Sequence, residues 1–240
     1  MKNKLVFSII ALVIILATLA FIIYGYYLKN NFKYENPVVT MEIENYGTVK
    51  MELYPEYAPN TVTNFIKLIN EGYYDGLTFH RVEDMLIQGG DINGDGTGST
   101  EYSIKGEFAE NDFKDNKLSF ERGTVGLARQ DYSMWAYYTG DYSYLEQGYN
   151  SGCAQFFIMA EDYTDFDGQY CAFGKVIEGM EIVDKLKVLE TKIETTTDEE
   201  TGETTENETT TPVEPPVIKS VKVETYGIDY GKPEIIKENI

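Results

Sequence analysis

The chain alternates hydrophobic and polar residues over short segments that are separated by turn-forming residues. The first two segments, 38–44 and 48–53, are joined by Asn45-Tyr46-Gly47, and this arrangement predicts a β-hairpin. Similar short segments follow at 77–82, 86–89, 124–128, 156–159, 172–176 and 217–225. Strands of this length that recur between turn signals are typical of an antiparallel β fold.

Two segments have helical spacing instead. The first begins at Pro59, which suits the first turn of a helix, and ends before Gly72. Its apolar residues are spaced by three and four positions, namely Val62, Phe65, Ile66 and Ile69. A second, shorter helix is predicted around 181–189. The patterning therefore predicts a mainly β domain with two helices packed on its sheet.

The N-terminal segment 5–28 contains no charged side chain. A helix of that length extends for about 36 Å, which exceeds the roughly 30 Å of a bilayer's hydrocarbon core. We therefore predict a single-pass membrane anchor over 1–28, a tether over 29–36, and a domain on the outer side of the membrane. A cleaved signal peptide is the alternative, since Lys2 and Lys4 form a basic start, but the apolar run is long for one.

Threonine and glutamate dominate residues 191–211, and apolar side chains are almost absent from them. Such a composition does not favour a packed core, so we predict a flexible acidic insert over 190–216. Alternation returns directly after it, which makes the insert a surface loop of one domain spanning 37–230. The last residues, 231–240, are predicted to be a C-terminal tail.

Composition excludes one class of partner. The formal net charge is −20, with 20 Lys and Arg residues against 40 Asp and Glu residues. Because nucleic-acid binding requires clustered basic side chains, we expect no nucleic-acid partner. The two cysteines, Cys153 and Cys171, leave two interpretations open, a disulfide or two buried thiols.

Five short motifs follow one another in a fixed order along the chain. They are Thr78–Val82 with Phe79-His80-Arg81, Gln88–Asp91, Gly123–Arg129, Ala154–Ile158 and Phe166–Val176. In this order and at these spacings, the sequence resembles the cyclophilins, a family of peptidyl-prolyl cis/trans isomerases. The resemblance extends from about Val38 to Tyr226. It implies an eight-stranded antiparallel barrel capped by two helices.

The resemblance also implies roles for individual residues. Arg81 matches the catalytic arginine of the family, and Gln88 matches the glutamine that holds the substrate beside it. The walls of a proline pocket are matched by Met85, Leu86, Phe157, Phe166 and Tyr170. The strip that binds the residues before the proline is matched by Ala128, Arg129 and Gln155. Proline-containing polypeptides are then the expected partners of a monomeric enzyme that uses no metal and no cofactor.

Physical chemistry supports an arginine in this role. Rotation about an X–Pro bond has a barrier of about 20 kcal/mol, because the nitrogen lone pair is delocalised into the carbonyl. Twisting the bond localises the lone pair on nitrogen. A permanently charged guanidinium at Arg81 would stabilise the twisted state more than either planar state, which is the requirement for catalysis.

Several alternatives depend on single features. His80 is the only histidine and could be a base in a hydrolase, although its position in a strand favours a satisfied core residue. Residues 91–96 resemble the start of a calcium loop but lack its closing glutamate. The tyrosine-rich segment 131–150 could bind glycans or could be a loop with its own packing cluster. A proline-peptide scaffold with weak turnover is the remaining alternative to an enzyme.

Overall fold

The computed structural model describes residues 2–31, 35–98, 100–197 and 204–237. The chain divides into two units, Met1–Glu35 and Asn36–Ile240, which we describe separately. The first unit consists of one helix, α1 (Lys2–Asn31). The helix continues to Asn31 and so includes the first part of the predicted tether 29–36.

Within α1, the segment Ile9–Tyr27 is long and apolar enough to cross a membrane. All of its side chains are exposed. Length and composition are the only basis for this statement, and an N-terminal signal sequence has the same properties. The predicted apolar helix is therefore present, while its location in a membrane stays a prediction.

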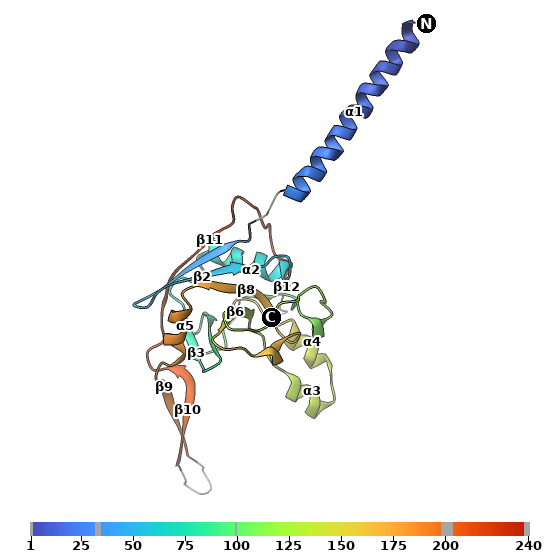
Figure 1. The fold of residues 1–240 in the computed structure, drawn as a ribbon. Coiled ribbons are helices and arrows are strands. Elements are labelled where there is room, and N and C mark those ends of the chain that lie inside the picture. The colour runs from blue at the N-terminus through green and yellow to red at the C-terminus, as the bar shows by residue number, and fades with distance from the viewer. Residues whose placement is uncertain (1, 32–34, 99, 198–203, 238–240) are drawn as a thin grey trace. The chain divides into compact units, whose positions relative to one another are not determined.

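The second unit is built on one eight-stranded antiparallel sheet with the order β11-β1-β2-β8-β6-β7-β4-β3 (Figure 1). Its strands are β1 (Val38–Ile43), β2 (Gly47–Leu53), β3 (Thr78–Val82), β4 (Leu86–Asp91), β6 (Thr124–Leu127), β7 (Phe156–Met159), β8 (Cys171–Glu178) and β11 (Ile218–Glu224). The sheet curls so that its outer strands approach each other: Ile218 N–H donates to Leu77 O at 2.7 Å, and Phe79 N–H donates to Pro216 O at 3.0 Å. The predicted eight-stranded fold is confirmed.

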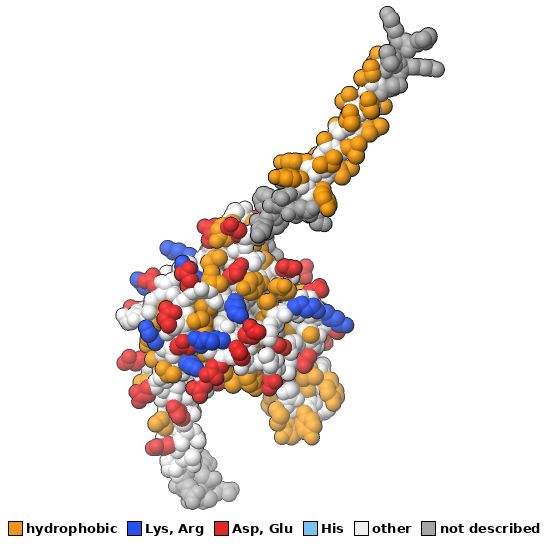
Figure 2. Space-filling model, viewed as in Figure 1, with side chains coloured by type: hydrophobic (Ala, Val, Ile, Leu, Met, Phe, Trp, Pro, Cys, Tyr) orange, Lys and Arg blue, Asp and Glu red, His pale blue; other side chains and the backbone are white. Residues whose placement is uncertain are grey.

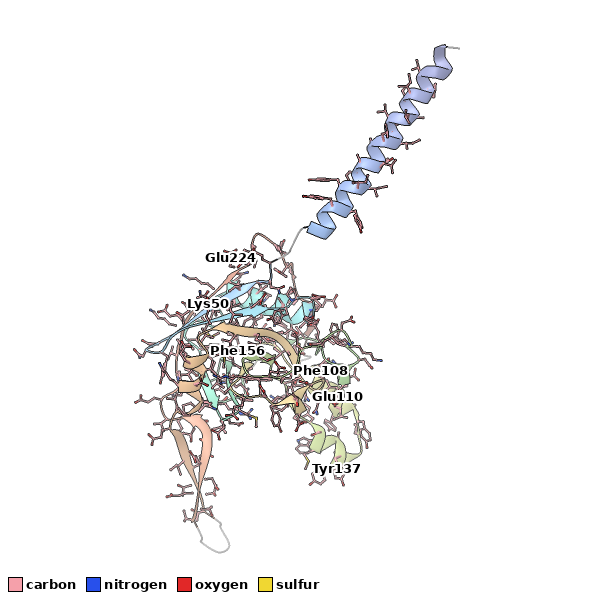
Figure 3. All side chains as sticks on the ribbon, in the orientation of Figure 1. Lys50, Phe108, Glu110, Tyr137, Phe156 and Glu224 are labelled. Atoms are coloured by element: carbon pink, nitrogen blue, oxygen red, sulfur yellow. The ribbon has the colours of Figure 1, made fainter. Side chains whose placement is uncertain are left out.

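The two faces of the curled sheet carry different side chains. Along β7, Phe156 and Ile158 belong to the main core, whereas Phe157 and Met159 belong to a second apolar cluster. Phe156 is central to the main core, where its ring contacts those of Phe65, Tyr74 and Phe79 at centroid distances of 5.6, 5.7 and 6.0 Å (Figure 3). The alternating pattern therefore separates a sealed interior from an outward-facing row of residues.

Helices α2 (Pro59–Asn70) and α5 (Met180–Lys187) confirm the two predicted helices. Proline occupies the start of α2, and the four apolar residues that predicted its buried face are all buried. One buried polar contact fixes the helix start, because the Glu107 carboxylate accepts the backbone N–H groups of Asn60 and Thr61 at 2.9 and 2.8 Å.

The connection between β6 and β7 contains two short helices, α3 (Ser133–Thr139) and α4 (Ser143–Tyr149), that the sequence did not predict. The rings of Tyr137 and Tyr138 contact each other edge-on at 5.6 Å, but the aromatic side chains of this connection do not form a buried cluster. Trp135, Tyr137 and Tyr138 are 63 %, 77 % and 75 % exposed. Hydrophobic side chains accordingly gather on the surface of this connection (Figure 2), and Tyr137 projects outward from α3 (Figure 3).

Two shorter helical turns and two short strands complete the domain. They are η1 (Ala109–Asn111), η2 (Thr164–Phe166), β5 (Tyr102–Ser103) and β12 (Ile236–Lys237). The last of these pairs with β5, in the register Ile236↔Ser103 and Lys237↔Tyr102. The predicted C-terminal tail is thus held against the domain through residue 237.

The acidic insert differs most from its prediction. It forms a two-stranded antiparallel hairpin, β9 (Thr191–Thr197) with β10 (Thr204–Pro212). The described part of 190–216 therefore has regular backbone pairing, while the flexibility predicted for the insert stays a prediction. Threonine has a high β propensity, and the backbone pairing within a hairpin does not require a buried face. As expected for a surface element, nearly all of its side chains are exposed.

Candidate active site

Nine of the ten residues predicted for the site line a single groove of about 370 Å³. These nine are Arg81, Leu86, Gln88, Ala128, Arg129, Gln155, Phe157, Phe166 and Tyr170. They come from β3, β4, β7 and η2 and from the connections after β6, before β7 and before β8, which are far apart in sequence. The antiparallel order of the strands is what brings them together.

Strand register explains how Arg81 and Phe157 reach the same groove. Arg81 pairs with Gln88, Gln88 pairs with Phe157, and Phe157 pairs with Gly126. Directly paired residues project from the same face of a sheet, so these positions form one row across four strands. The two rows on either side of it, one through Ile87 and Ile158 and the other through Phe156 and Leu127, face the core.

A β-bulge in β3 is needed to place Arg81 in this row. Phe79 pairs with Gly89 and Arg81 with Gln88, which leaves His80 as an extra residue in the ladder. Regular alternation would direct Phe79 and Arg81 to the same face. Because the bulge changes the alternation, Phe79 is fully buried in the core while Arg81 lines the groove.

The guanidinium of Arg81 is held from two sides. Nε donates to Glu83 Oε1 at 2.7 Å, Nη2 lies 2.6 Å from the same oxygen, and Nη1 donates to Gln88 Oε1 at 3.1 Å. A guanidinium has five N–H groups, so one on each terminal nitrogen is left without a partner among the described residues. The Arg81 side chain is 40 % exposed, and a ligand can therefore reach these two groups.

The row of hydrogen bonds continues away from Arg81. Gln88 Nε2 donates to Gln155 Oε1 at 2.8 Å, and Gln155 Nε2 donates to the carbonyls of Gly96 and Gly98 at 3.1 and 2.8 Å. The loop that carries these carbonyls is fixed by the buried carboxylate of Asp91, which accepts the N–H groups of Asp95 and Gly96 at 2.9 and 2.7 Å. Asp91 thus organises the segment that resembled a calcium loop.

The apolar side of the groove is an aromatic cluster. Phe157 stacks on Phe120 at 5.6 Å and 21°, and its ring meets Phe166 and Tyr170 edge-on at 5.9 Å. Gly126 lies beneath the ring of Phe157, where an added Cβ would overlap that ring and come within 2.7 Å of Phe120. Glycine is therefore required if Phe157 is to keep its position.

Met85 and Arg129 differ from the other predicted residues. Met85 does not line the groove, although it packs against the apolar cluster that contains Leu86 and Phe157. The guanidinium of Arg129 lies over the ring of Tyr170 at 4.4 Å, and its Nε donates to Gln169 O at 3.1 Å. These contacts give the Arg129 charge a structural role at the groove wall.

Three features of the site escaped prediction. Glu83 anchors Arg81, Phe120 supports Phe157, and Thr210 and Thr211 of β10 line the groove. Glu83 has a visible signal, because an acid two residues after an arginine in a strand shares its face. The threonines have no such signal, since they belong to an insert.

His80 is buried, as predicted, but one of its ring nitrogens lacks the hydrogen bond that we expected. Its Nδ1 has no hydrogen-bond partner among the described residues, and its side chain lines the groove next to Asp95 and Gly96. Burial lowers the pKa of the imidazole, and the nearby Arg81 charge acts in the same direction, while Asp91 opposes both. The imidazole is therefore held in its neutral form.

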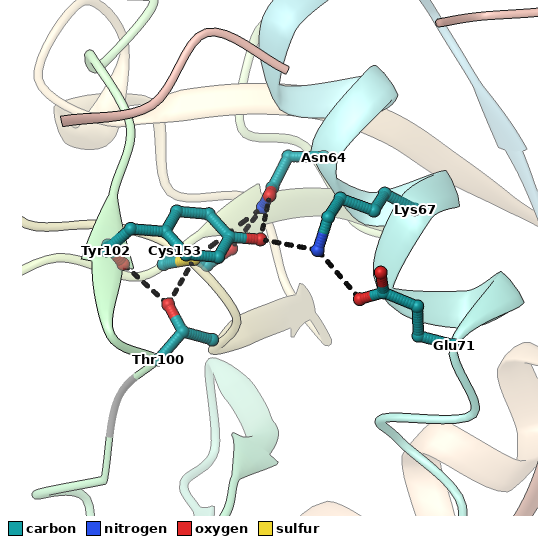
Figure 4. A network of polar contacts seen from close by, with 6 residues as sticks. All are labelled: Asn64, Lys67, Glu71, Thr100, Tyr102 and Cys153. Atoms are coloured by element: carbon teal, nitrogen blue, oxygen red, sulfur yellow. Dashed lines mark hydrogen bonds and ion pairs between the residues drawn. The ribbon is translucent and has the colours of Figure 1, made fainter. Parts of the chain in front are cut away.

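Cys153 and Cys171 are both free and buried. Of the two interpretations that the sequence left open, the structure therefore supports two buried thiols and not a disulfide. Cys153 belongs to a polar network (Figure 4): its Sγ accepts from Thr100, its carbonyl accepts from Asn64 at 2.8 Å, and Asn64 Oδ1 accepts from Tyr102 at 2.9 Å. Burial raises the pKa of the Cys153 thiol and raises that of Cys171 to about 12. Both thiols remain protonated near neutral pH, and neither is an activated nucleophile.

Comparison with known proteins agrees with this geometry. A model of the family described as cyclophilin type peptidyl-prolyl cis-trans isomerase/CLD matches residues 38–223. Peptidyl-prolyl cis-trans isomerase B of Bacillus subtilis is 39 % identical over 58 % of this chain and 82 % of its own. A peptidyl-prolyl cis-trans isomerase of Helicobacter pylori is 35 % identical over 60 % of this chain and 76 % of its own.

Among solved structures, a cyclophilin type peptidyl-prolyl cis-trans isomerase of Cryptosporidium parvum has a similar fold. Its TM-score is 0.57 and its identity 25 %, with 79 % of this chain and 98 % of that chain covered. The chain therefore belongs to the cyclophilin-type peptidyl-prolyl cis-trans isomerases. It is an isomerase of that class.

The environment of His80 gives a testable dependence of stability on pH. Because the folded-state pKa is below the ordinary 6.5, the unfolded chain binds the proton first as the pH falls. We expect the stability that depends on neutral His80 to be present above pH 6.5 and to be lost as the pH falls toward the folded-state pKa.

The measurement is the melting temperature of the full-length chain between pH 7 and pH 5, a range above most carboxylate titrations. The native chain should lose stability over this range, and a His80→Asn variant should lose clearly less. Equal losses in the two chains would contradict the assigned state of His80.

Proposed function

We propose that Arg81 catalyses the isomerisation of X–Pro bonds bound in this groove, and that the enzyme, acting as a monomer, assists the folding of exported or membrane-proximal polypeptides. The observation that carries the catalytic part is the fixed guanidinium of Arg81. It has two unpartnered N–H groups among the described residues and lies beside an aromatic pocket. No covalent intermediate is needed for this reaction.

In this proposal, the proline ring binds against Leu86, Phe157 and Phe166. An apolar pocket removes water from the ring and holds it while the preceding carbonyl rotates. A cyclophilin of Cryptosporidium parvum with 25 % identity was solved in the presence of the dipeptide Ala-Pro, which supports a site of this size. The strip formed by Ala128 and Gln155 would bind the residues that precede the proline.

Arg81 would act on the rotating bond itself. In the twisted state, the prolyl nitrogen gains electron density and becomes a hydrogen-bond acceptor, and the free N–H groups of Arg81 can donate to it. Glu83 and Gln88 hold the guanidinium before the substrate arrives, so little reorganisation is needed during the rotation. One preorganised charged donor of this kind lowers the barrier by roughly 3 to 4 kcal/mol.

The test of this role is the rate of cis/trans exchange in an Ala-Pro peptide. We expect Arg81→Ala to lower kcat/KM by about 10² to 10³-fold, because the charged donor is lost in the transition state. Arg122→Ala is the matched control. Its guanidinium pairs with Asp184 at 2.7 Å and does not line the groove, so activity should be retained.

An Arg81→Ala variant with the activity of the native chain would contradict the catalytic role of Arg81. If the native chain bound the peptide without accelerating exchange, the groove would be a binding site only, and the proposed enzyme function would be wrong.

The proposed location depends on α1. Its segment Ile9–Tyr27 exposes apolar side chains all around the helix, and such a helix is stable in a hydrocarbon environment. In cells that express the full chain, the domain should be degraded by protease added to intact cells. Survival of the domain in intact cells, with degradation after permeabilisation, would contradict an outward-facing domain.

A further inference from the structure

A second groove lies next to the one that contains Arg81. Its volume is about 690 Å³, and we call it the hairpin groove because β9 and β10 form one of its walls. Its lining residues come from four segments of the chain, namely 82–85, 161–163, 187–189, and Thr191, Glu208 and Thr209 of the hairpin. Glu83 and Met85 belong to its lining, but the groove as a whole has no role in the function proposed above.

The hairpin groove adjoins the candidate active site, although the two grooves share no lining residue among those that the structure describes. Glu83 lines it and also binds Arg81, while Met85 lines it and packs on the apolar cluster of the proline pocket. Strand β10 lies against β3 and contributes to both grooves, since Thr210 lines the first and Glu208 lines the second. A polypeptide bound at Arg81 can therefore extend from one groove into the other.

The direction of that polypeptide follows from the row of hydrogen bonds. The row runs from Gln155 through Gln88 and Arg81 to Glu83. The proposed function assigns the residues before the proline to the Gln155 end. The residues after the proline then leave at the Glu83 end, where the hairpin groove begins.

The hairpin groove is strongly acidic. Its acidic side chains are Glu83, Asp84, Glu161, Asp162 and Glu208, and Lys187 is the only basic one among the described residues that line it. The Lys187 ammonium is already occupied, since it donates to Glu161 Oε1 at 2.7 Å and to Asp84 O at 3.0 Å. The carboxylate of Asp84 has no hydrogen-bond or ion-pair partner among the described residues.

The groove also has an apolar part, which includes Met85, Tyr163 and Leu189. A surface that combines apolar side chains with carboxylates suits lysine and arginine. Their aliphatic stems pack on apolar side chains while the charged end groups reach acceptors at the edge. An acidic or short polar side chain would gain neither contact.

We propose that the hairpin groove is an extended substrate subsite that binds Lys or Arg side chains located after the isomerised proline. This inference rests on the proposed function, because it uses the direction of the bound polypeptide. It assigns a role to the acidic hairpin, which then selects substrates by charge. The chemistry of bond rotation remains with Arg81.

The test uses three peptides that share one Ala-Pro bond. They differ only at the second and third residues after the proline, which are both Lys, both Gln or both Glu. Binding to the full-length chain in a non-ionic detergent is measured by NMR titration, and exchange is measured in the same samples. We expect the Lys peptide to bind about threefold to tenfold more tightly than the Gln peptide, and the Glu peptide more weakly than both.

Two variants test whether the preference for the Lys peptide arises in the hairpin groove. Asp84→Asn combined with Glu208→Gln removes two charges from the groove and should reduce the difference between the Lys and Gln peptides to less than about twofold. Glu56→Gln is the matched control, because this exposed glutamate lines neither groove, and the preference should persist. Raising the salt concentration should weaken the preference of the native chain.

The outcomes separate this inference from the proposed function. Equal affinity for the three peptides, or a preference that survives in the double variant, would overturn the subsite even if all three peptides were isomerised. A charge preference that disappears in the double variant would support the subsite even without accelerated exchange, and in that case the proposed function would be wrong.

Discussion

The single extra residue in β3 is the constraint on which the rest of the site depends. The bulge at His80 lets Phe79 face the core while Arg81, two residues later, faces the groove. Once Arg81 is on the outer face, strand register places Gln88 and Phe157 in the same row, and Glu83 reaches the guanidinium from the other side. The charged and apolar halves of the site are therefore positioned by backbone pairing.

Much of the fold could be predicted because local patterns decided it. Alternation identified the strands, and helical spacing identified α2 with its buried face. Alternation could not reveal the bulge, since Phe79 and Arg81 have the same parity and a regular strand would direct both to one face. Nine of the ten candidate site residues line one groove, and they were predicted from ordered motifs that resemble the family, not from periodicity.

The missed features have a common physical cause, which is that they depend on contacts between distant segments. The acidic insert has no apolar face, so composition predicted no structure, yet backbone pairing makes it a hairpin along β3. Likewise, Phe120 supports Phe157 only because Gly126 leaves room beneath that ring. If the hairpin groove selects basic substrates, the insert adds specificity to a site whose catalytic residue, Arg81, belongs to the eight-stranded sheet.

The central claim is that Arg81 acts as a guanidinium held in place by Glu83, and a double-mutant cycle on kcat/KM for a neutral Ala-Pro peptide tests it most directly. We predict that Glu83→Gln lowers kcat/KM about tenfold in the native chain, because the guanidinium loses its fixed orientation. In an Arg81→Ala background, the same substitution should change kcat/KM less than about twofold. An equal loss in both backgrounds would contradict the account, since Glu83 would then act independently of Arg81.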